Sequence, residues 1–260
     1  KKIKFSKIVA VCDKNFGKAK TLSKKIGGQP FLNYKKMIES INIDLVIILT
    51  ESGSHYKICK YVLQKNIHVL CEKPLTMLPS KSLKLYKISK SKKLMCGVIF
   101  QNRFNPAIKF LKNALEKKRF GKIIKVSISL TWCRYQNYYE DGWHGTWKND
   151  GGVINQQAIH HIDILRWLFG PIIKINATTT KRLNKLQAED TTVAIIKLFD
   201  GSIGTIEATT AARPKDLEAK ITINGQYGNV IIGGIALNKI EHWEFIKKKN
   251  TNKNAKNKYS

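Results

Sequence analysis

Residues 151–170 carry the feature that most limits how this chain can fold, a segment that is apolar around most of a helix. At about 100° per residue its apolar side chains cover most of the circumference, and a helix of that kind is buried rather than laid on a surface. The segment begins with two glycines, Asn155 is placed to cap the first turn of the helix, and Gly170 ends it. The segment therefore predicts a helix inside a domain.

A narrow polar stripe remains on this helix, formed by Gln156, His160 and Asp163. The stripe is either a solvated face or a polar cluster facing a pocket, with His160 as a proton acceptor. A histidine has an ordinary pKa of about 6.5 and can accept a proton near neutral pH. Asp163 lies one helical turn further on, where it could orient the imidazole ring. Gln156 cannot ionise, so we expect it only to hold a substrate hydroxyl.

A second stretch, residues 67–75, reads as a short buried strand that runs into a Glu72-Lys73-Pro74 turn. Ligands of α/β sheets bind at the carboxyl ends of the strands, which makes Lys73 a candidate site residue. In a chain this rich in lysine, a surface lysine in a turn is the alternative interpretation.

Together the two stretches resemble the glucose-fructose oxidoreductase/inositol dehydrogenase (Gfo/Idh/MocA) family. Its members carry a Glu-Lys-Pro turn in a dinucleotide-binding domain and a Gly-Gly…His-x-x-Asp helix in a second domain, and the similarity runs over nearly all of the chain. Within the family, the chain looks most like enzymes that oxidise C3 of UDP-N-acetylglucosamine or its uronic acid. The residues that carry this finer likeness are 143–147, 155–156, 189–191, 204–210 and 238–241.

The fold class implied is α/β: an incomplete Rossmann-like dinucleotide-binding domain at 1–103, then an α+β domain with an open, mostly antiparallel sheet at 104–246. A disordered basic tail at 247–260 is expected to follow. No Gly-x-Gly-x-x-Gly/Ala turn occurs in the sequence. We therefore expect a chain truncated at both ends, with an empty lane in its first sheet where the first strand of the family would lie.

The pattern of apolar residues supplies the individual elements. In the first domain we expect strands at 7–13, 45–49, 67–71 and 94–100, with 45–49 buried on both faces. Helices are expected at 17–26, 34–40, 56–64 and 79–91. In the second domain the expected strands are 122–132, 172–180, 191–199, 202–210, 217–224 and 229–233.

The resemblance implies NAD as the cofactor. Asp13 closes a strand and would bond the ribose hydroxyls. The remaining cofactor contacts implied are Thr50, His55, Glu72, Lys73 and Arg103, although Arg103 could equally form an ion pair. The family's tight turn also implies a cis bond between Lys73 and Pro74.

The same resemblance implies hydride transfer from a sugar hydroxyl, with Lys73, His160 and Asp163 as catalytic residues. His160 would accept the hydroxyl proton, and Lys73 would stabilise the alkoxide or share the proton. Aromatic faces would stack on sugar and uracil, and Arg134 would bind a phosphate. The substrate-binding residues expected are Arg134, Tyr135, Tyr139, Trp143, Trp147, Asn155, Gln156 and His160. The alternatives are a packing loop at 135–147, a dehydrogenase of another sugar or cyclitol, and a catalytically silent fragment or scaffold.

Composition narrows the partners. The net charge of +29 could indicate a nucleic-acid binder, but the lysines are spread evenly and no nucleic-acid motif occurs, so we expect none. The five cysteines lack zinc-like spacing, and no metal site is expected. No apolar run reaches the roughly 18 residues of a membrane span, and no signal peptide is evident. We expect a cytoplasmic homo-oligomer, a dimer or tetramer when complete, that acts on a nucleotide sugar.

Overall fold

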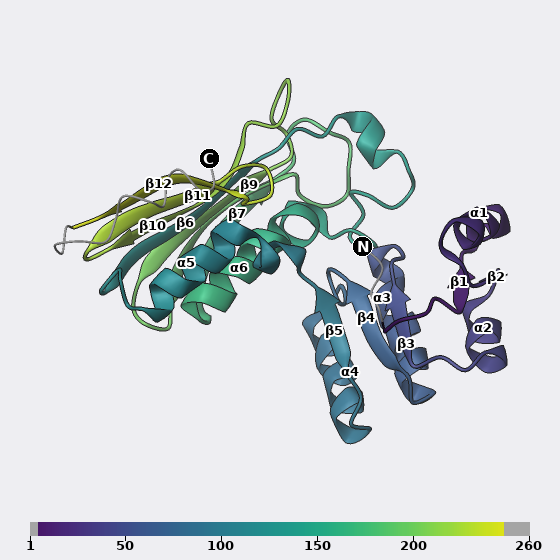
Figure 1. Ribbon diagram of the computed structural model, residues 1–260. Coiled ribbons are helices and arrows are strands. Elements are labelled where there is room, and N and C mark those ends of the chain that lie inside the picture. The colour runs from purple at the N-terminus through teal and green to yellow at the C-terminus, as the bar shows by residue number, and fades with distance from the viewer. Residues whose placement is uncertain (1–4, 247–260) are drawn as a thin grey trace.

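The computed structural model describes residues 5–246, which form a parallel α/β region followed by a larger sheet with helices on one face (Figure 1). The strands of the first region are β1 (Ala10–Cys12), β2 (Gln29–Phe31), β3 (Leu45–Ile48), β4 (His68–Glu72) and β5 (Cys96–Ile99). Its helices are α1 (Phe16–Ile26), α2 (Tyr34–Ser40), α3 (Ser52–Gln64) and α4 (Pro79–Ser91). Every helix predicted for this region is present, although α3 begins four residues earlier than expected.

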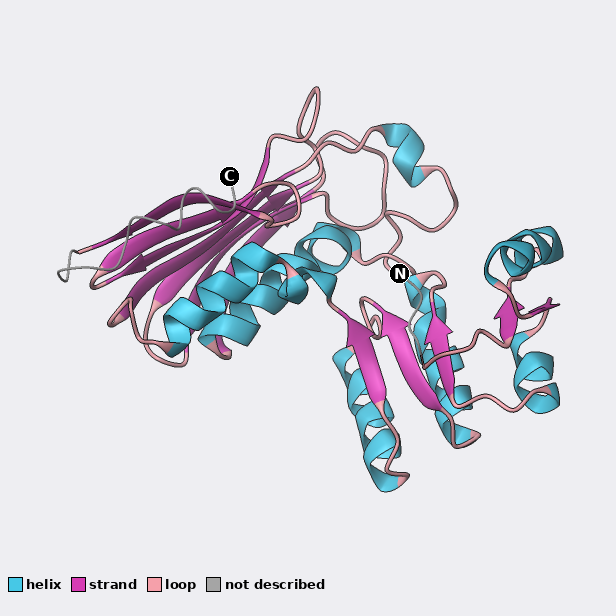
Figure 2. Cartoon of the chain, in the orientation of Figure 1, coloured by secondary structure: helices cyan, strands magenta, loops and turns pink. Residues whose placement is uncertain are grey.

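The strands of this region form two separate sheets. Strands β1 and β2 pair with each other, and β3, β4 and β5 form a second parallel sheet in that order. Within the described residues β1 shares no ladder with β3, and Figure 2 shows the two-stranded pair set apart from the three-stranded sheet. The expected empty lane is therefore confirmed.

Strand β3 corrects the prediction of a strand buried on both faces. Val46 and Ile48 are buried, whereas Leu45 is 43% exposed and Ile47 54% exposed. Helix α3 packs against β3, and the half-exposed Leu45 and Ile47 mark the face that stays partly open. An uninterrupted apolar run gave no means of foreseeing which face would remain open.

The second region is a seven-stranded sheet in the order β12-β11-β10-β6-β9-β8-β7. Every neighbouring pair is antiparallel except β6 and β9, which confirms an open and mostly antiparallel sheet. Its strands are β6 (Ile123–Thr131), β7 (Ile172–Thr180), β8 (Thr191–Leu198), β9 (Ile203–Thr209), β10 (Glu218–Gly225), β11 (Gly228–Gly233) and β12 (Lys239–Phe245).

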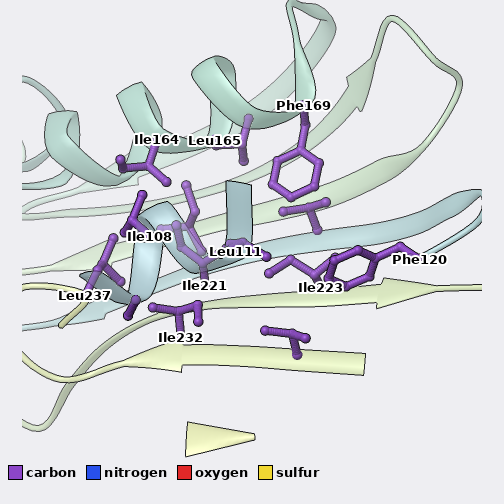
Figure 3. Packing of buried hydrophobic residues seen from close by; sticks show 14 of the residues in the cluster. Ile108, Leu111, Phe120, Ile164, Leu165, Phe169, Ile221, Ile223, Ile232 and Leu237 are labelled. Atoms are coloured by element: carbon purple, nitrogen blue, oxygen red, sulfur yellow. The ribbon is translucent and has the colours of Figure 1, made fainter. Parts of the chain in front are cut away.

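Two helices, α5 (Pro106–Glu116) and α6 (Ile159–Phe169), cover one face of this sheet (Figure 1). The sequence analysis missed α5, although proline at its first position is typical of a helix start. Ile108 and Leu111 of α5, with Ile164 and Leu165 of α6, pack on alternate strand residues such as Ile221 (Figure 3). The opposite face stays open, with exposed apolar side chains at Ile173, Ile175, Val193, Ile195 and Ile203.

The apolar segment at 151–170 is a buried helix, as predicted, but it does not begin at Asn155. Its first helical residues are 152–153, followed by a π turn, η3 (Ile154–Ala158), that leads into α6. Glu189 supplies the N-terminal contacts, because its carbonyl accepts from Val153 N at 3.1 Å and its Oε1 from Ile154 N at 3.3 Å. Asn155 therefore lies inside the helix, and the N-cap prediction was wrong.

The chain passes from the first region to the second through a short 3₁₀ turn, η1 (Gln101–Phe104). Within residues 5–246, none of the helices combines the length and apolarity that a membrane span requires. The tail expected at 247–260 lies outside the described residues.

Candidate active site

The carboxyl ends of three parallel strands bring Asp13, Thr50 and Lys73 to the same edge of the first region. These residues follow β1, β3 and β4 respectively. The loops after β1 and β3 are joined by Lys14 Nζ, which bonds Glu51 Oε1 at 3.0 Å. Parallel sheets bind their ligands at this edge, so the placement is compatible with the cofactor contacts predicted for Asp13, Thr50 and Lys73.

Asp13 keeps one carboxylate oxygen free for such a ligand. Its Oδ1 accepts from Asn15 N at 2.7 Å, and no partner is recorded for Oδ2 within the described residues. Asn15 in turn caps α1 by accepting from Lys18 N at 3.1 Å. The residues present thus fit the ribose side of a dinucleotide. A glycine-rich turn for the pyrophosphate is not among them.

His55 is buried, and both of its ring nitrogens face backbone carbonyls. Nδ1 lies 2.7 Å from Pro74 O, and Nε2 lies 2.9 Å from Thr50 O. These contacts fasten the loop after β3 to the turn that carries Lys73, so the ring fixes this edge of the site. The Lys73-Pro74 bond in that turn is cis, as expected, and Glu72 Oε2 accepts from Lys73 N at 3.0 Å.

Lys73 reaches from the first region to the polar stripe of the second. Its Nζ donates to the backbone oxygen of Gln156 at 2.6 Å and to Gln156 Oε1 at 3.1 Å. The π turn that contains Gln156 is a feature often found at functional sites. Burial lowers the pKa of Lys73, while the negative charges of Glu72 and Asp150 oppose that shift.

His160 lies one turn after Gln156 on the same helix and is partly buried. Its Nδ1 is shielded and has no hydrogen-bond partner within the described residues, and Phe100 meets the ring edge-on at a centroid distance of 6.1 Å. Burial, and then the positive charge of Lys73, lower the pKa of His160 to about 4. The imidazole is therefore neutral at pH 7 and able to accept a proton.

The sequence suggested that Asp163 orients His160, but the structure gives Asp163 another partner. It forms a two-pronged ion pair with Arg103, whose Nε donates to Oδ2 at 2.6 Å and whose Nη2 donates to Oδ1. The guanidinium also lies over the rings of Phe100 and Trp167. Arg103 thus fastens the crossing between the regions to α6, which matches the ion-pair alternative for this residue.

Asp150 is a site residue that the sequence analysis missed. Its carboxyl is buried, and Oδ2 accepts from Gly145 N at 2.8 Å. Burial raises the pKa of Asp150, and the nearby charges of His144 and Lys73 act against that rise. Only its position before the glycine pair hinted at a role. Among residues 5–246, no group of three or more His, Cys, Asp or Glu side chains is arranged to hold a metal ion.

The phosphate contact predicted for Arg134 is not supported by its surroundings. Its Nη1 bonds Asp216 Oδ1 at 3.2 Å and Cys133 O at 2.7 Å, and the guanidinium lies between the rings of Trp132 and Tyr138. These contacts commit Arg134 to holding its own loop.

The aromatic residues of the loop at 135–147 divide into fixed and free side chains. Tyr139 is fixed by Thr210 Oγ1 at 2.7 Å, and Trp143 stacks on His144 at a centroid distance of 3.6 Å. Tyr135 is half-exposed and bonds Pro214 O at 3.2 Å, while Trp147 is 60% exposed. The structure thus offers Trp147 as an uncommitted ring for a ligand.

One consequence of the Lys73–His160 arrangement can be measured directly. Because the ammonium of Lys73 helps to depress the pKa of His160, we expect Lys73→Met to raise that pKa from about 4, though not fully to its ordinary value, since burial persists. Titrating the imidazole by NMR would follow the change. Lys84→Met, on the exposed face of α4, is the control. An unchanged pKa in Lys73→Met would show that the two groups are not coupled.

Known proteins share this fold. The "Oxidoreductase family, NAD-binding Rossmann fold" profile matches residues 1–100, and the "GFO/IDH/MocA C-terminal domain" profile matches residues 108–231. The WlbA dehydrogenase of Bordetella pertussis, solved with NADH and UDP-GlcNAcA, superposes with a TM-score of 0.89 and 34% identity, over 92% of this chain and 74% of its own. The WlbA protein of Chromobacterium violaceum, with the same two ligands, gives 0.89 and 35%, over 93% and 70%.

More distant relatives act on other sugars. The levoglucosan dehydrogenase of Pseudarthrobacter phenanthrenivorans is 22% identical over 233 residues, which cover 76% of this chain and 57% of that protein. This chain spans between 42 and 67% of the length of the first three curated relatives. Since the two profiles together cover most of the chain and the WlbA structures exceed 30% identity, the chain belongs to the GFO/IDH/MocA oxidoreductase family.

Proposed function

We propose that this chain serves an NAD-dependent dehydrogenase that removes hydride from C3 of a UDP-N-acetyl-hexosamine or its uronic acid, in the synthesis of cell-surface polysaccharide precursors. One observation carries the proposal. Lys73 Nζ of the first region bonds Gln156 of the second, one helical turn from a neutral His160. The ammonium of Lys73, the imidazole of His160 and the amide of Gln156 are thereby placed between the carboxyl end of β4 and the second region.

The proton step follows from the charges of these groups. A neutral His160 accepts the proton of the sugar hydroxyl, and the ammonium of Lys73 stabilises the negative charge that develops on the oxygen. The low pKa of His160 means that the imidazolium readily gives the proton up again. Gln156 Oε1 or its amide group can bond a neighbouring hydroxyl of the sugar, which fixes the ring relative to Lys73.

NAD⁺, when bound, accepts the hydride. The chain's own contribution would be Asp13 toward the ribose hydroxyls and Lys73, at the carboxyl end of β4, toward the reacting end. The ion pair of Arg103 with Asp163 would keep the crossing between the two regions, and with it Phe100 and His160, in a fixed arrangement.

The choice of substrate rests on the relatives and on Gln156, which lies one helical turn before His160. Both WlbA proteins hold UDP-GlcNAcA in their structures. Gln156 cannot ionise, so it adds no acid–base group to His160 and Lys73 at this position of the helix. This pattern favours the nucleotide-sugar branch.

The test is a comparison of four alcohols with NAD⁺, with the appearance of NADH as readout. The alcohols are UDP-N-acetylglucosaminuronic acid, UDP-N-acetylglucosamine, free N-acetylglucosamine and scyllo-inositol. We expect NAD⁺ to be reduced in the presence of one or both UDP-sugars, and little NADH to form with free N-acetylglucosamine or scyllo-inositol. Activity restricted to the free sugar or to the cyclitol would contradict the proposal. Activity with the cyclitol is the second candidate, because a Bacillus subtilis scyllo-inositol 2-dehydrogenase is 26% identical over 240 residues.

Cofactor selectivity gives a further prediction. The free carboxylate oxygen of Asp13 would accept bonds from ribose hydroxyls and repel a 2′-phosphate, so NAD should be preferred over NADP. Asp13→Ala should narrow this preference, and the ratio of kcat/KM values for the two cofactors measures it. Asp44→Ala, directly before the amino end of β3, is the control. Equal use of both cofactors by the unaltered protein would remove Asp13 from this role.

A further inference from the structure

A cavity of about 720 Å³ lies beside the aromatic loop, outside the Lys73–His160 centre. One wall is Tyr139 with residues 144–146, and the other is the connection between β7 and β8, residues 181–187. The sequence analysis assigned nothing to this connection.

The cavity is lined by cations without matching anions. The connection contributes Lys181, Arg182 and Lys185, and none of the lining residues is Asp or Glu. Lys181 Nζ bonds Leu186 O at 3.0 Å, whereas Arg182 and Lys185 are exposed and take part in no ion pair within residues 5–246. Two carboxylates adjoin the lining: Asp141, which contacts His144 Nδ1 at 2.6 Å, and the buried Asp150, whose Oδ2 accepts from Gly145 N at 2.8 Å, against three cations from the connection. A ligand in this cavity therefore meets excess positive charge.

The backbone that carries these cations is held in place. Gly145 O accepts from the backbone N–H groups of Gln187 and Ala188, both at 2.9 Å. The side chain of Gln136 accepts from Lys185 N at 2.7 Å and donates to Lys185 O at 3.3 Å. Asn184, which is buried, donates to Arg134 O at 3.0 Å. Only the ends of Arg182 and Lys185 need to order on binding, which keeps the entropic cost low.

The cavity adjoins the centre where the sugar would react. Tyr139 lines it, and the neighbouring Tyr138 accepts through its hydroxyl from Gln157 Nε2 at 3.3 Å. Gln157 follows Gln156, which holds Lys73. The wall of the cavity is thus connected, through Tyr138 and Gln157, to the turn that carries Gln156.

We propose that this cavity binds the diphosphate of a nucleotide-linked sugar, with Arg182 and Lys185 as its phosphate ligands. Guanidinium and ammonium groups are the side chains best suited to phosphate oxygens. The role that the sequence gave to Arg134 passes to these residues, because Arg134 is committed to Asp216. This inference rests on the proposed function and adds the residues that recognise the nucleotide part of its substrate.

Direct binding tests the cavity without cofactor or turnover. Calorimetric titration would compare UDP, uridine and inorganic pyrophosphate on the unaltered protein and on Arg182→Gln and Lys185→Gln. Each variant should weaken UDP binding about tenfold, the usual effect of losing one charge-assisted bond, and leave uridine binding unchanged. Lys174→Gln, which removes the same charge from an exposed position on β7, is the control and should not alter UDP binding. UDP should bind more tightly than pyrophosphate, since Tyr139 in the cavity wall offers a ring to the nucleoside.

The outcomes separate this inference from the proposed function. UDP affinity that is absent, or that both variants leave unchanged, would overturn the diphosphate assignment. Pyrophosphate that binds as tightly as UDP would overturn the nucleotide part of the proposal. If UDP binds as expected but no UDP-sugar reduces NAD⁺, the cavity stands and the proposed dehydrogenase activity fails. If a UDP-sugar is oxidised with a KM that neither Arg182→Gln nor Lys185→Gln changes, the activity stands and the cavity assignment fails.

Discussion

Replacing His160 with alanine is expected to lower turnover of the UDP-sugar by roughly 10²–10⁴-fold, the range for losing a general base. The reason is the neutral imidazole beside Lys73, which is the group placed to take the hydroxyl proton. NAD⁺ affinity should change little, because none of the contacts at Asp13 or Thr50 involves His160. Steady-state rates with UDP-N-acetylglucosaminuronic acid, together with a separate NAD⁺ titration, measure both quantities.

Two companion variants sharpen this experiment. His160→Gln keeps a polar side chain but cannot act as a base near neutral pH, so it should lose a similar share of turnover. His242→Ala, on β12 and paired with Glu244 rather than with the site, should keep full turnover. Full turnover in both His160 variants would mean that the base lies elsewhere and that the polar stripe of the helix is structural.

The pH profile follows from the same group. A base must be deprotonated to act, and the pKa of His160 is lowered to about 4. Activity that depends on it should persist as the pH falls through 6.5 and decline only near the lowered value. An acid limb at the ordinary histidine pKa would show that cofactor or substrate binding removes the effect of Lys73 and burial.

Local sequence patterns predicted helices and strands well where the structure of a segment does not depend on the elements packed against it. The strand expected at 191–199 is β8, and its side chains alternate between buried, as at Ala194 and Ile196, and exposed, as at Val193 and Ile195. The strand expected at 45–49 is present, but its partly open face was not foreseen, because a run that is apolar at every position does not show which face is covered. Propensity also did not reveal α5, since its start follows directly on the crossing turn η1.

The sequence named candidate site residues, but it did not indicate the contacts that these residues make. Lys73 and His160 were identified from two short strings that lie far apart in sequence, and the fold brings them to one place. Their immediate partners depend on long-range pairing that no local pattern encodes. Arg103 reaches Asp163 across 60 residues, and Arg134 reaches Asp216 across 82. Each of these pairs changed the role that the sequence had assigned to one of its members.

The π turn before α6 has the same explanation. Its first N–H groups are satisfied by Glu189, 35 residues away from Ile154. Asn155 has a residue type that is common at N-caps. The start of the helix is nevertheless set by Glu189, which lies just before β8. Gly152 allows this approach, since a side chain at that position would collide with the Glu189 carboxylate.

The second large effect concerns acid stability and is expected at His161. The side chain is 1% exposed, neither ring nitrogen has a partner in the described residues, and Trp132 lies edge-on at a centroid distance of 6.3 Å. Burial, and then the charge of His160, lower the pKa of His161 to about 3. The folded state therefore resists a proton that the unfolded chain, with an ordinary pKa of about 6.5, accepts readily.

The sign of the effect follows from this difference. Above about pH 6.5 both states are neutral at this residue and its contribution to stability is complete. As the pH falls from 6.5 toward 3 the unfolded chain gains the proton first, so the free energy of unfolding decreases. The loss approaches the order of 4–5 kcal/mol once the pH lies below both pKa values.

His161→Phe tests this by keeping a ring of similar size without titratable nitrogens. We expect its free energy of unfolding at pH 7 to lie within roughly 1 kcal/mol of the unaltered protein, because no hydrogen bond is removed. Between pH 6.5 and 4 its stability should fall less steeply than that of the unaltered protein, as followed by urea unfolding at several pH values. His242→Phe, at a partly exposed histidine on β12, should leave the slope unchanged. Parallel curves for His161→Phe and the unaltered protein would mean that the folded protein accommodates the charged ring, by water or by a shift of Trp132, and that burial at this position does not hold it neutral.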